Sequence, residues 1–368
     1  MTALLSVMVS KFPQTLTGGR NRGLSSAALL VGSLWASLGL SIATSRAIAE
    51  EGVVPASATA PATSPATSPA TSPAIESKSP SVVPAVTPAT TPANSTPVTA
   101  AVMRRVGGLD WFTDYSAAYR DAQAGGRPLF VVFYDPRSTV QRDNYERETL
   151  ARPELATALA KVTRAVIPTD ATLPGVGDAK PQRVLASSAF NWLAGGSGLA
   201  VVDLADKRSP TFGSVISAHP FSGRMYYGVQ ATETILSLPP GTMTQRAMVF
   251  ALRMHPERPQ SVWGSAHPTL MYQSLAASQL MAQYQSVGHH NWGGRLAEIQ
   301  SQSSLSPFEV AAVSFGAANP IDAAAEIVQN WRGSGAHWGG ISSPQRWYGY
   351  DMVQGPSGLW YGNGLFAN

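Results

Sequence analysis

The chain has 368 residues, of which 44% are hydrophobic and 13% charged, with a formal net charge of +4 and no cysteine. Without cysteine, the protein cannot form disulfide bonds or carry out thiol–disulfide exchange, which needs a thiolate. Its basic residues are scattered, and no basic run is interleaved with aromatic residues. The sequence therefore gives no indication of nucleic-acid binding.

Residues 1–49 are predicted to be an export segment. Basic residues precede an uncharged apolar stretch from Leu24 to Thr44, and Ala47-Ile48-Ala49 offers a small-x-small cleavage site. Two interpretations stay open, a cleaved signal peptide or an uncleaved membrane anchor, because about 20 residues can cross a bilayer. In both, the cations ahead of the apolar stretch place the rest of the chain outside the inner membrane, so we expect a periplasmic, cell-surface or secreted protein.

A disordered linker is predicted over residues 50–107. This stretch is rich in proline, threonine and alanine, and Pro61–Ala74 repeats the sequence Pro-Ala-Thr-Ser. Proline removes backbone donors, and threonine and alanine bury little surface, so no core can form here. We expect a semi-extended spacer with polyproline II character.

The first globular segment, residues 108–240, alternates helical and strand patterns. The predicted elements are a helix over 114–123, a strand over 129–134, a helix over 140–161 with a kink at Pro153, a strand over 164–168, a helix over 182–193, strands over 199–204 and 211–217, and a helix over 231–238. This order predicts an α/β domain with a mixed sheet.

The stretch Trp111–Ala118 and the run Arg127–Phe133 resemble the opening of thioredoxin-like domains. The resemblance implies a thioredoxin-like mixed sheet with flanking helices. In that family, paired cysteines begin the next helix, a place that falls within Ser138–Arg142 here. The loop before the third strand, where the family has a cis-proline, reads Gly196–Leu199. Both redox features are missing, so we expect a scaffold or a binding module.

The second globular segment, residues 245–368, contains two strong helical patterns, one ending near Gly288 and one over 322–332. Aromatic residues alternate around glycines in the tail from Arg346 to Phe366, which predicts an antiparallel hairpin. Residues 245–261 are interpreted as a junction piece.

Three features of this segment form a pattern. Glu326-x4-Trp331 is followed by Ser334-Gly335-Ala336-His337, and His289 or His290 follows the first helix with Arg295 beyond it. The pattern resembles the CAP superfamily (cysteine-rich secretory, antigen 5 and pathogenesis-related proteins), in its bacterial form without cysteines. The resemblance implies a CAP-like α-β-α sandwich.

Glu309 resembles the glutamate of the family's Gly-Glu-Asn motif, although Phe308 and Val310 replace its neighbours. The resemblance implies that His289, with His290 as the alternative, lines one cleft together with Glu309, Glu326 and His337. In some members the histidines hold a divalent metal, so His289 and His337 are candidate ligands of zinc or another divalent cation. Imidazole nitrogens suit zinc, and carboxylates can orient them.

The sequence as a whole favours an exported binding protein over an enzyme, with a lipid, glycan or protein of the cell envelope as its ligand. A zinc-dependent hydrolase or peptidase that uses the same cleft is the alternative from another class. A purely structural envelope protein is the third hypothesis.

Several residues receive a plain structural interpretation. Three histidines beside prolines, His219, His255 and His267, are expected in solvated loops, and Glu146 and Glu148 on an exposed helix face. The tryptophans of the second segment are expected to build its core: Trp292, Trp331, Trp338, Trp347 and Trp360.

Overall fold

The computed structural model describes residues 9–10, 103–174, 180–222 and 226–368, and all of these belong to one compact unit. Apart from Val9–Ser10, the predicted export segment therefore lies outside the described residues, and so does almost all of the predicted linker. Across the described ranges, no helix combines the length and the apolar character that a membrane span requires.

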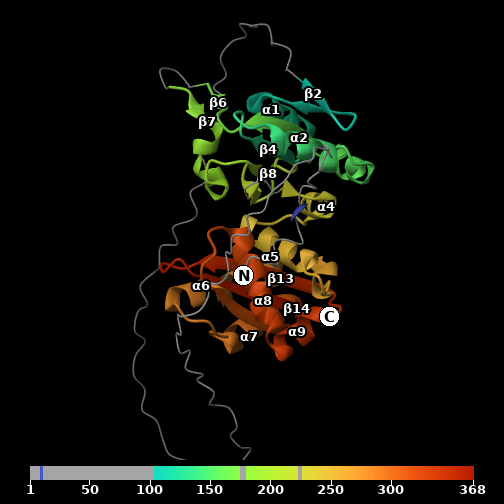
Figure 1. Ribbon diagram of the computed structural model, residues 1–368. Helices are drawn as coiled ribbons and strands as arrows, with labels where there is room; N and C mark the ends of the chain where they lie inside the picture. The colour runs from blue at the N-terminus through green and yellow to red at the C-terminus, as the bar shows by residue number, and fades with distance from the viewer. Residues whose placement is uncertain (1–8, 11–102, 175–179, 223–225) are drawn as a thin grey trace, which may run out of the picture. The chain divides into compact units, whose positions relative to one another are not determined.

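The first sheet has six strands in the order β2-β3-β5-β4-β8-β9. Its strands β2, β4 and β8 are labelled in Figure 1. The strands β3, β5 and β4 run parallel, and the other neighbours are antiparallel, so the predicted mixed sheet is confirmed. The strands are β2 (Met103–Val106), β3 (Leu109–Phe112), β4 (Leu129–Tyr134), β5 (Thr163–Pro168), β8 (Gly198–Val202) and β9 (Val215–Pro220).

The central strand β4 is apolar because both of its faces are covered. Phe130 and Val132 pack into one hydrophobic cluster, whereas Leu129 and Val131 pack into another, as alternation along a strand requires. The second of these clusters includes Ala118 of helix α1. The helical elements of this part are α1 (Tyr115–Gly125), α2 (Val140–Tyr145), the π-helical turn η2 (Glu146–Leu150), the 3₁₀ turn η3 (Pro153–Leu155), α3 (Ala156–Ala160), and α4 (Val229–Ser237).

Some boundaries differ from the predictions for physical reasons. The predicted helix over 140–161 is broken at Arg152, whose backbone is extended because Pro153 follows it. The predicted strand over 211–217 starts only at Val215, because the Asp203 carboxylate accepts hydrogen bonds from Ser209 and Thr211 and holds a turn there.

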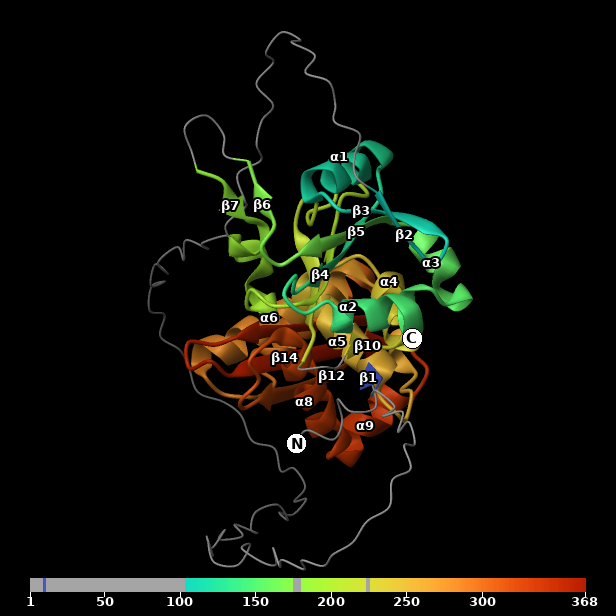
Figure 2. The same cartoon turned by 45° about the horizontal axis from the view of Figure 1, so that its top comes forward.

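The predicted helix over 182–193 is a short strand followed by two 3₁₀ turns. Strand β7 (Gln182–Arg183) pairs with β6 (Thr172–Leu173), and the turns are η4 (Val184–Ala186) and η5 (Ser188–Leu193). A further short strand, β10 (Tyr226–Tyr227), pairs antiparallel with β1 (Val9–Ser10) (Figure 2).

The second sheet has four strands in the order β11-β13-β14-β12. Its strands are β11 (Ser265–Ala266), β12 (Phe308–Ser314), β13 (Trp347–Gln354) and β14 (Trp360–Ala367). Strands β13 and β14 form the antiparallel hairpin that the sequence predicts for the tail.

Helices cover both faces of the second sheet (Figure 1). Helix α6 packs on one face, where Leu270 meets Leu365, and helix α8 packs on the other, where Trp331 meets Tyr350. The helical elements here are α5 (Met243–Met254), the 3₁₀ turn η6 (Ser261–Trp263), α6 (Pro268–Tyr284), α7 (Trp292–Ser303), α8 (Pro320–Arg332) and α9 (Gly335–Ser342). The protein is therefore a mixed α/β structure with helices layered on two principal sheets.

Residues 245–261, which the sequence analysis interprets as a junction piece, include most of helix α5. Thr242 caps the helix in a capping box with Gln245, and Phe250 is 1% exposed. The Phe250 ring lies 4.8 Å from the ring of His219 in β9, and α5 also packs against α8 and β13. We call the part from β2 to α4 the first lobe and the part from α5 to β14 the second lobe; α5 belongs to the core that they share.

Three predictions of solvated side chains are wrong, those for His219, Glu146 and His255. His219 is 1% exposed, because β9 extends through it into the shared core, and burial together with the charge of Arg246 lowers the pKa of His219 to about 3. Glu146 is 7% exposed in the π-helical turn and pairs with Arg104 at 2.5 Å. Burial raises the pKa of Glu146.

His255 is also buried, against Trp338, and His267 is partly buried beside Trp347. The tryptophan prediction is confirmed for Trp331, Trp338 and Trp360, which are buried. Trp292 and Trp347 are only partly buried.

Candidate functional site

Glu309, the second residue of β12, is the most tightly held of the predicted site residues. Its side chain is 2% exposed. One carboxylate oxygen accepts from the guanidinium of Arg295 and from the amide of Asn363, the latter at 2.8 Å. The other lies 2.8 Å from Nδ1 of His289. Because an ionised carboxylate only accepts, this contact places the hydrogen of the His289 ring on Nδ1.

The alternation of strands explains why these groups meet. Glu309 and Ala311 point to the same face of β12, and Ala311 pairs with Asn363 of β14. Ala311 packs against Met281 of α6, so this is the α6 face of the sheet.

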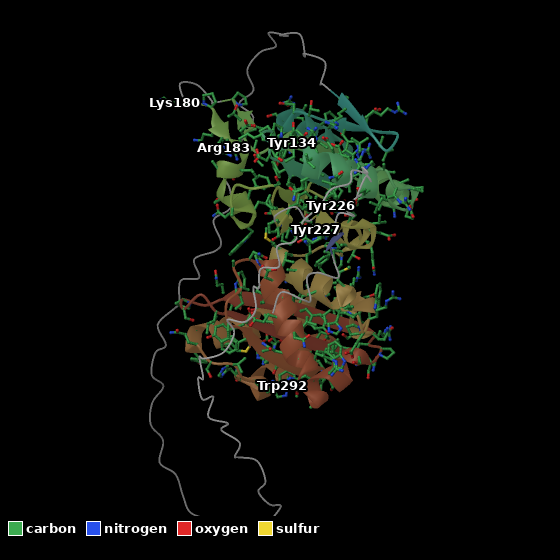
Figure 3. All side chains as sticks on the ribbon, viewed as in Figure 1. Tyr134, Lys180, Arg183, Tyr226, Tyr227 and Trp292 are labelled. Carbon is green, nitrogen blue, oxygen red and sulfur yellow. The ribbon has the colours of Figure 1, made fainter. Side chains whose placement is uncertain are left out.

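Arg295 approaches the same face from the first turn of α7. It is 4% exposed, and its guanidinium lies 5.3 Å from the ring of Trp292, which is labelled in Figure 3. A buried arginine is costly unless a carboxylate compensates it, and Glu309 does so.

His337 lies next to His289, the histidine that contacts the Glu309 carboxylate. Their ring centroids are 6.5 Å apart with an interplanar angle of 69°. The His289 side chain is 48% exposed, and its Nδ1 is engaged by Glu309, so Nε2 remains to meet a ligand. Burial and the neighbouring His289 lower the pKa of His337, which keeps its imidazole neutral at pH 7.

His290, the alternative to His289, does not join this cluster. Its Nε2 lies 2.9 Å from the carbonyl oxygen of Ser286, and its ring packs on Tyr284 at 5.0 Å. We refer to His289, Glu309, Arg295, Asn363 and His337 as the histidine cluster.

Glu326, the fourth residue of the predicted cleft, makes its hydrogen bonds outside the histidine cluster. Its carboxylate accepts from the Ser314 hydroxyl at 2.6 Å and from the Phe315 backbone N–H at 3.2 Å. Glu326 belongs to α8, which covers the face of the sheet opposite to α6, and it contacts the far end of β12. Glu309 thus lies at the start of β12 on the α6 face of the sheet, and Glu326 contacts the end of β12 on the α8 face.

The residues of the cluster do not form a complete zinc site. The described part of the chain contains no group of three or more histidine, aspartate or glutamate side chains placed to hold a metal ion. Both oxygens of Glu309 are already engaged by protein donors. Two imidazoles on one tetrahedral zinc ion, with bonds of about 2.0 Å, would bring their centroids to roughly 5 Å, closer than the 6.5 Å found here.

Sequence reasoning missed Asn363. This side chain is 0% exposed, and its amide fixes the Glu309 carboxylate. A signal was present, since a single amide stands between Gly362 and Gly364 in an otherwise aromatic and apolar strand. A buried polar group in such a strand must find a partner.

The first lobe has an ion pair just before Ser138–Arg142, the range where the thioredoxin-like resemblance would put its cysteines. Arg137 donates to Asp135 at 3.0 Å, and both groups are exposed. Arg142 stacks over the ring of Tyr134, which Figure 3 labels, at 4.5 Å. Without a thiol, this loop has no redox chemistry to offer.

Comparison with known proteins adds little. No family model and no curated protein matches the chain. Among solved structures, an outer surface protein from Borrelia burgdorferi is similar at 14% identity, over 28% of this chain and 77% of that chain, with a TM-score of 0.24. A TM-score this low does not support a common fold.

Proposed function

We propose that the protein is exported and binds a lipid, glycan or protein of the cell envelope at the exposed imidazoles of His289 and His337. The observation that carries the proposal is the contact between the His289 ring and the buried carboxylate of Glu309. The His289 imidazole is half exposed, yet a buried carboxylate that is itself paired with Arg295 fixes its orientation. A surface histidine without a binding role does not require such a fixed orientation.

The cluster has chemistry suited to hydrogen bonding. With its hydrogen on Nδ1, the His289 ring offers Nε2 as an acceptor, and a neutral His337 can donate from one nitrogen and accept at the other. Because Glu309 and Arg295 hold His289 in place, little side-chain freedom is lost when a ligand binds.

The architecture supports the two family resemblances. Parallel strands β3, β5 and β4, followed by the antiparallel pair β8–β9 and the helix α4, are compatible with a thioredoxin-like first lobe. A sheet with α6 on one face and α8 on the other is compatible with a CAP-like second lobe. Export is supported by the basic and apolar pattern of residues 1–49.

Histidine ring NMR on the purified protein tests the proposal. On titration with phospholipid vesicles, peptidoglycan fragments and envelope protein extracts, we expect one class of ligand to shift the ring signals of His289 and His337. The substitution His337→Ala should abolish binding of that ligand, whereas His290→Ala, the adjacent control outside the cluster, should leave it unchanged. If no ligand class moves these signals, or if both variants behave alike, the proposal is wrong.

One observation favours the alternative of a zinc-dependent hydrolase. A carboxylate bonded to Nδ1 of an imidazole is the arrangement that orients metal-binding histidines. This alternative predicts stoichiometric zinc in gently purified protein and hydrolytic activity that His337→Ala removes. For a purely structural envelope protein, the same substitution would change stability alone.

A further inference from the structure

A cavity of about 490 Å³ lies where the two lobes meet, and none of its lining residues belongs to the histidine cluster. Its walls come from η5 and the end of β9 in the first lobe and from the residues that precede α8 in the second. The volume falls within the range of about 300–1,000 Å³ that is usual for small-molecule sites. The main lining residues are Ser188, Asn191, Trp192, Pro220 and Asn319.

The chemistry of this lining is uncharged. All of the described lining residues lack a charged side chain, and the polar ones carry only hydroxyl and amide groups. A charged ligand would therefore be desolvated without a partner of opposite charge. The ligand that suits the cavity is neutral and rich in hydrogen-bonding groups.

Trp192 supplies an aromatic surface whose position is fixed. Its ring packs against Trp360 of β14, with centroids 5.4 Å apart and an interplanar angle of 55°. Trp360 is 2% exposed, so the supporting ring is anchored in the core, while Trp192 is only partly buried. Within the described ranges, no residue accepts a hydrogen bond from the Trp192 indole N–H, which can therefore serve a ligand.

Asn319 supplies an amide of fixed orientation. Its oxygen accepts from the backbone N–H groups of Ile321 and Asp322, and its Nδ2 donates to the Asp322 carboxylate at 2.8 Å. An amide has two N–H groups, so one remains to donate to a ligand. The exposed side chains of Ser188 and Asn191 have no hydrogen-bonding partner in the part of the chain that the structure describes.

We infer that this cavity between the lobes binds an uncharged carbohydrate. A sugar ring presents an apolar C–H face and a rim of hydroxyl groups, and the cavity offers an aromatic ring beside hydroxyl and amide groups. The C–H face of the sugar would stack on Trp192, and its hydroxyl groups would form hydrogen bonds with Asn191, Asn319 and Ser188. The inference does not rest on the histidine cluster, and it gives the first lobe a role without thiols.

Tryptophan fluorescence and calorimetry on the purified protein test this inference. We expect saturable binding of at least one of maltotriose, cellotriose and triacetylchitotriose, and none of trigalacturonate, which is their charged counterpart. Trp192→Ala should weaken binding at least about tenfold through the lost aromatic surface. Asn191→Ala, a change at an exposed side chain, should weaken it about three- to tenfold through a lost hydrogen bond.

Trp263→Ala is the matched control, because Trp263 is 56% exposed and lies outside the cavity. It should leave sugar binding unchanged, and so should His337→Ala. The inference is overturned if no neutral sugar binds, if trigalacturonate binds instead, or if Asn191→Ala binds as well as the wild type. Binding that His337→Ala abolishes and Trp192→Ala spares would place the sugar at the histidine cluster and would support the proposed function alone.

Discussion

Two glutamates that look alike in the sequence have different environments in the structure. Glu309 is buried and compensates a buried arginine, whereas Glu326 is partly buried and accepts hydrogen bonds from Ser314 and Phe315. The cost of removing each charge should differ accordingly, since breaking a buried pair leaves its partner uncompensated.

We expect Glu309→Gln to lower the free energy of unfolding by about 3 kcal/mol, because Arg295 loses its only close anionic partner among the described residues. Glu326→Gln should cost about 1 kcal/mol, since the amide oxygen still accepts one of the two hydrogen bonds and no buried cation loses its partner. Urea denaturation measures both values. Equal costs for the two variants would contradict the environments described here.

Asp351 of β13 is a buried acid that sequence reasoning did not single out. It is 0% exposed and accepts hydrogen bonds from Thr244 at 2.7 Å and Gln245 at 2.9 Å, both at the start of α5. Burial raises the pKa of Asp351 from 3.8 to about 6, in spite of these hydrogen bonds and one from the Met352 N–H, which lower it.

The stability of the protein should therefore depend on pH through Asp351. Between pH 4 and 6 the folded chain keeps a proton that the unfolded chain releases, so this contribution falls as the pH rises and is constant above pH 6. The change is at most about 3 kcal/mol, at about 1.4 kcal/mol per pKa unit.

Asp351→Asn, which cannot titrate, isolates this effect from that of other groups such as His219. As the pH falls from 7 to 4.5, the free energy of unfolding of the wild type should increase relative to that of this variant. Chemical denaturation at the two pH values measures the difference. A difference that stays constant with pH would show that Asp351 keeps an ordinary pKa.

At the scale of elements, the close contact between α6 and β13 depends on Gly349. A Cβ at this position would overlap the backbone of Leu270 and Met271, which cannot move away without shifting the helix. Gly362 and Gly364 of β14 likewise leave no room for a Cβ. These glycines of the tail are therefore required for close packing.

Gly349→Ala is expected to destabilise the protein by about 2 kcal/mol or more, because the helix must move off the sheet. Gly339→Ala in α9 is the control, since a Cβ there meets no atom within 4 Å. This control should be neutral or stabilising by up to about 1 kcal/mol. Thermal unfolding followed by circular dichroism compares the two, and a neutral Gly349→Ala would contradict the observed contact.

The elements that the sequence predicted well are those with strong apolar runs. The predicted strand over 129–134 agrees with β4, because a run covered on both faces carries its own signal. The sequence did not predict a helix within the junction at 245–261, because the apolar pattern of α5 is interrupted by Arg246. Only the tertiary structure shows that the charged guanidinium of Arg246 has hydrogen-bond acceptors inside the protein.

At the scale of the whole molecule, Arg246 connects the two lobes. It is 4% exposed, and it donates to the Ser217 hydroxyl of β9 and to the backbone carbonyl oxygens of Ile235, Leu238 and Pro239, all at 2.8–2.9 Å. Burial lowers the pKa of Arg246 to about 10, so the guanidinium stays charged at neutral pH.

We expect the two lobes to unfold in one transition, and Arg246→Met to lower the free energy of unfolding by about 3 kcal/mol through the loss of several buried hydrogen bonds. Arg253→Met on the same helix should cost less, about 1 kcal/mol, since Arg253 makes an exposed hydrogen bond to the Ser237 carbonyl oxygen and stacks over the exposed ring of Trp263 at 5.1 Å. Fluorescence and circular dichroism during denaturation would detect two separate transitions, which would contradict a shared core.

The sequence by itself determined the features that composition and local pattern control. These are the lack of thiol chemistry and the central strands of the two sheets. The export segment and the linker stay predictions, because almost all of their residues lie outside those that the structure describes. The tertiary structure decided which polar residues meet. It placed Glu309, Arg295, Asn363 and the two histidines together and Glu326 on the opposite face of the sheet. The physical reason is that strand register and the packing of helices on a sheet are set by contacts between distant residues, and neither can be obtained from spacing along the chain.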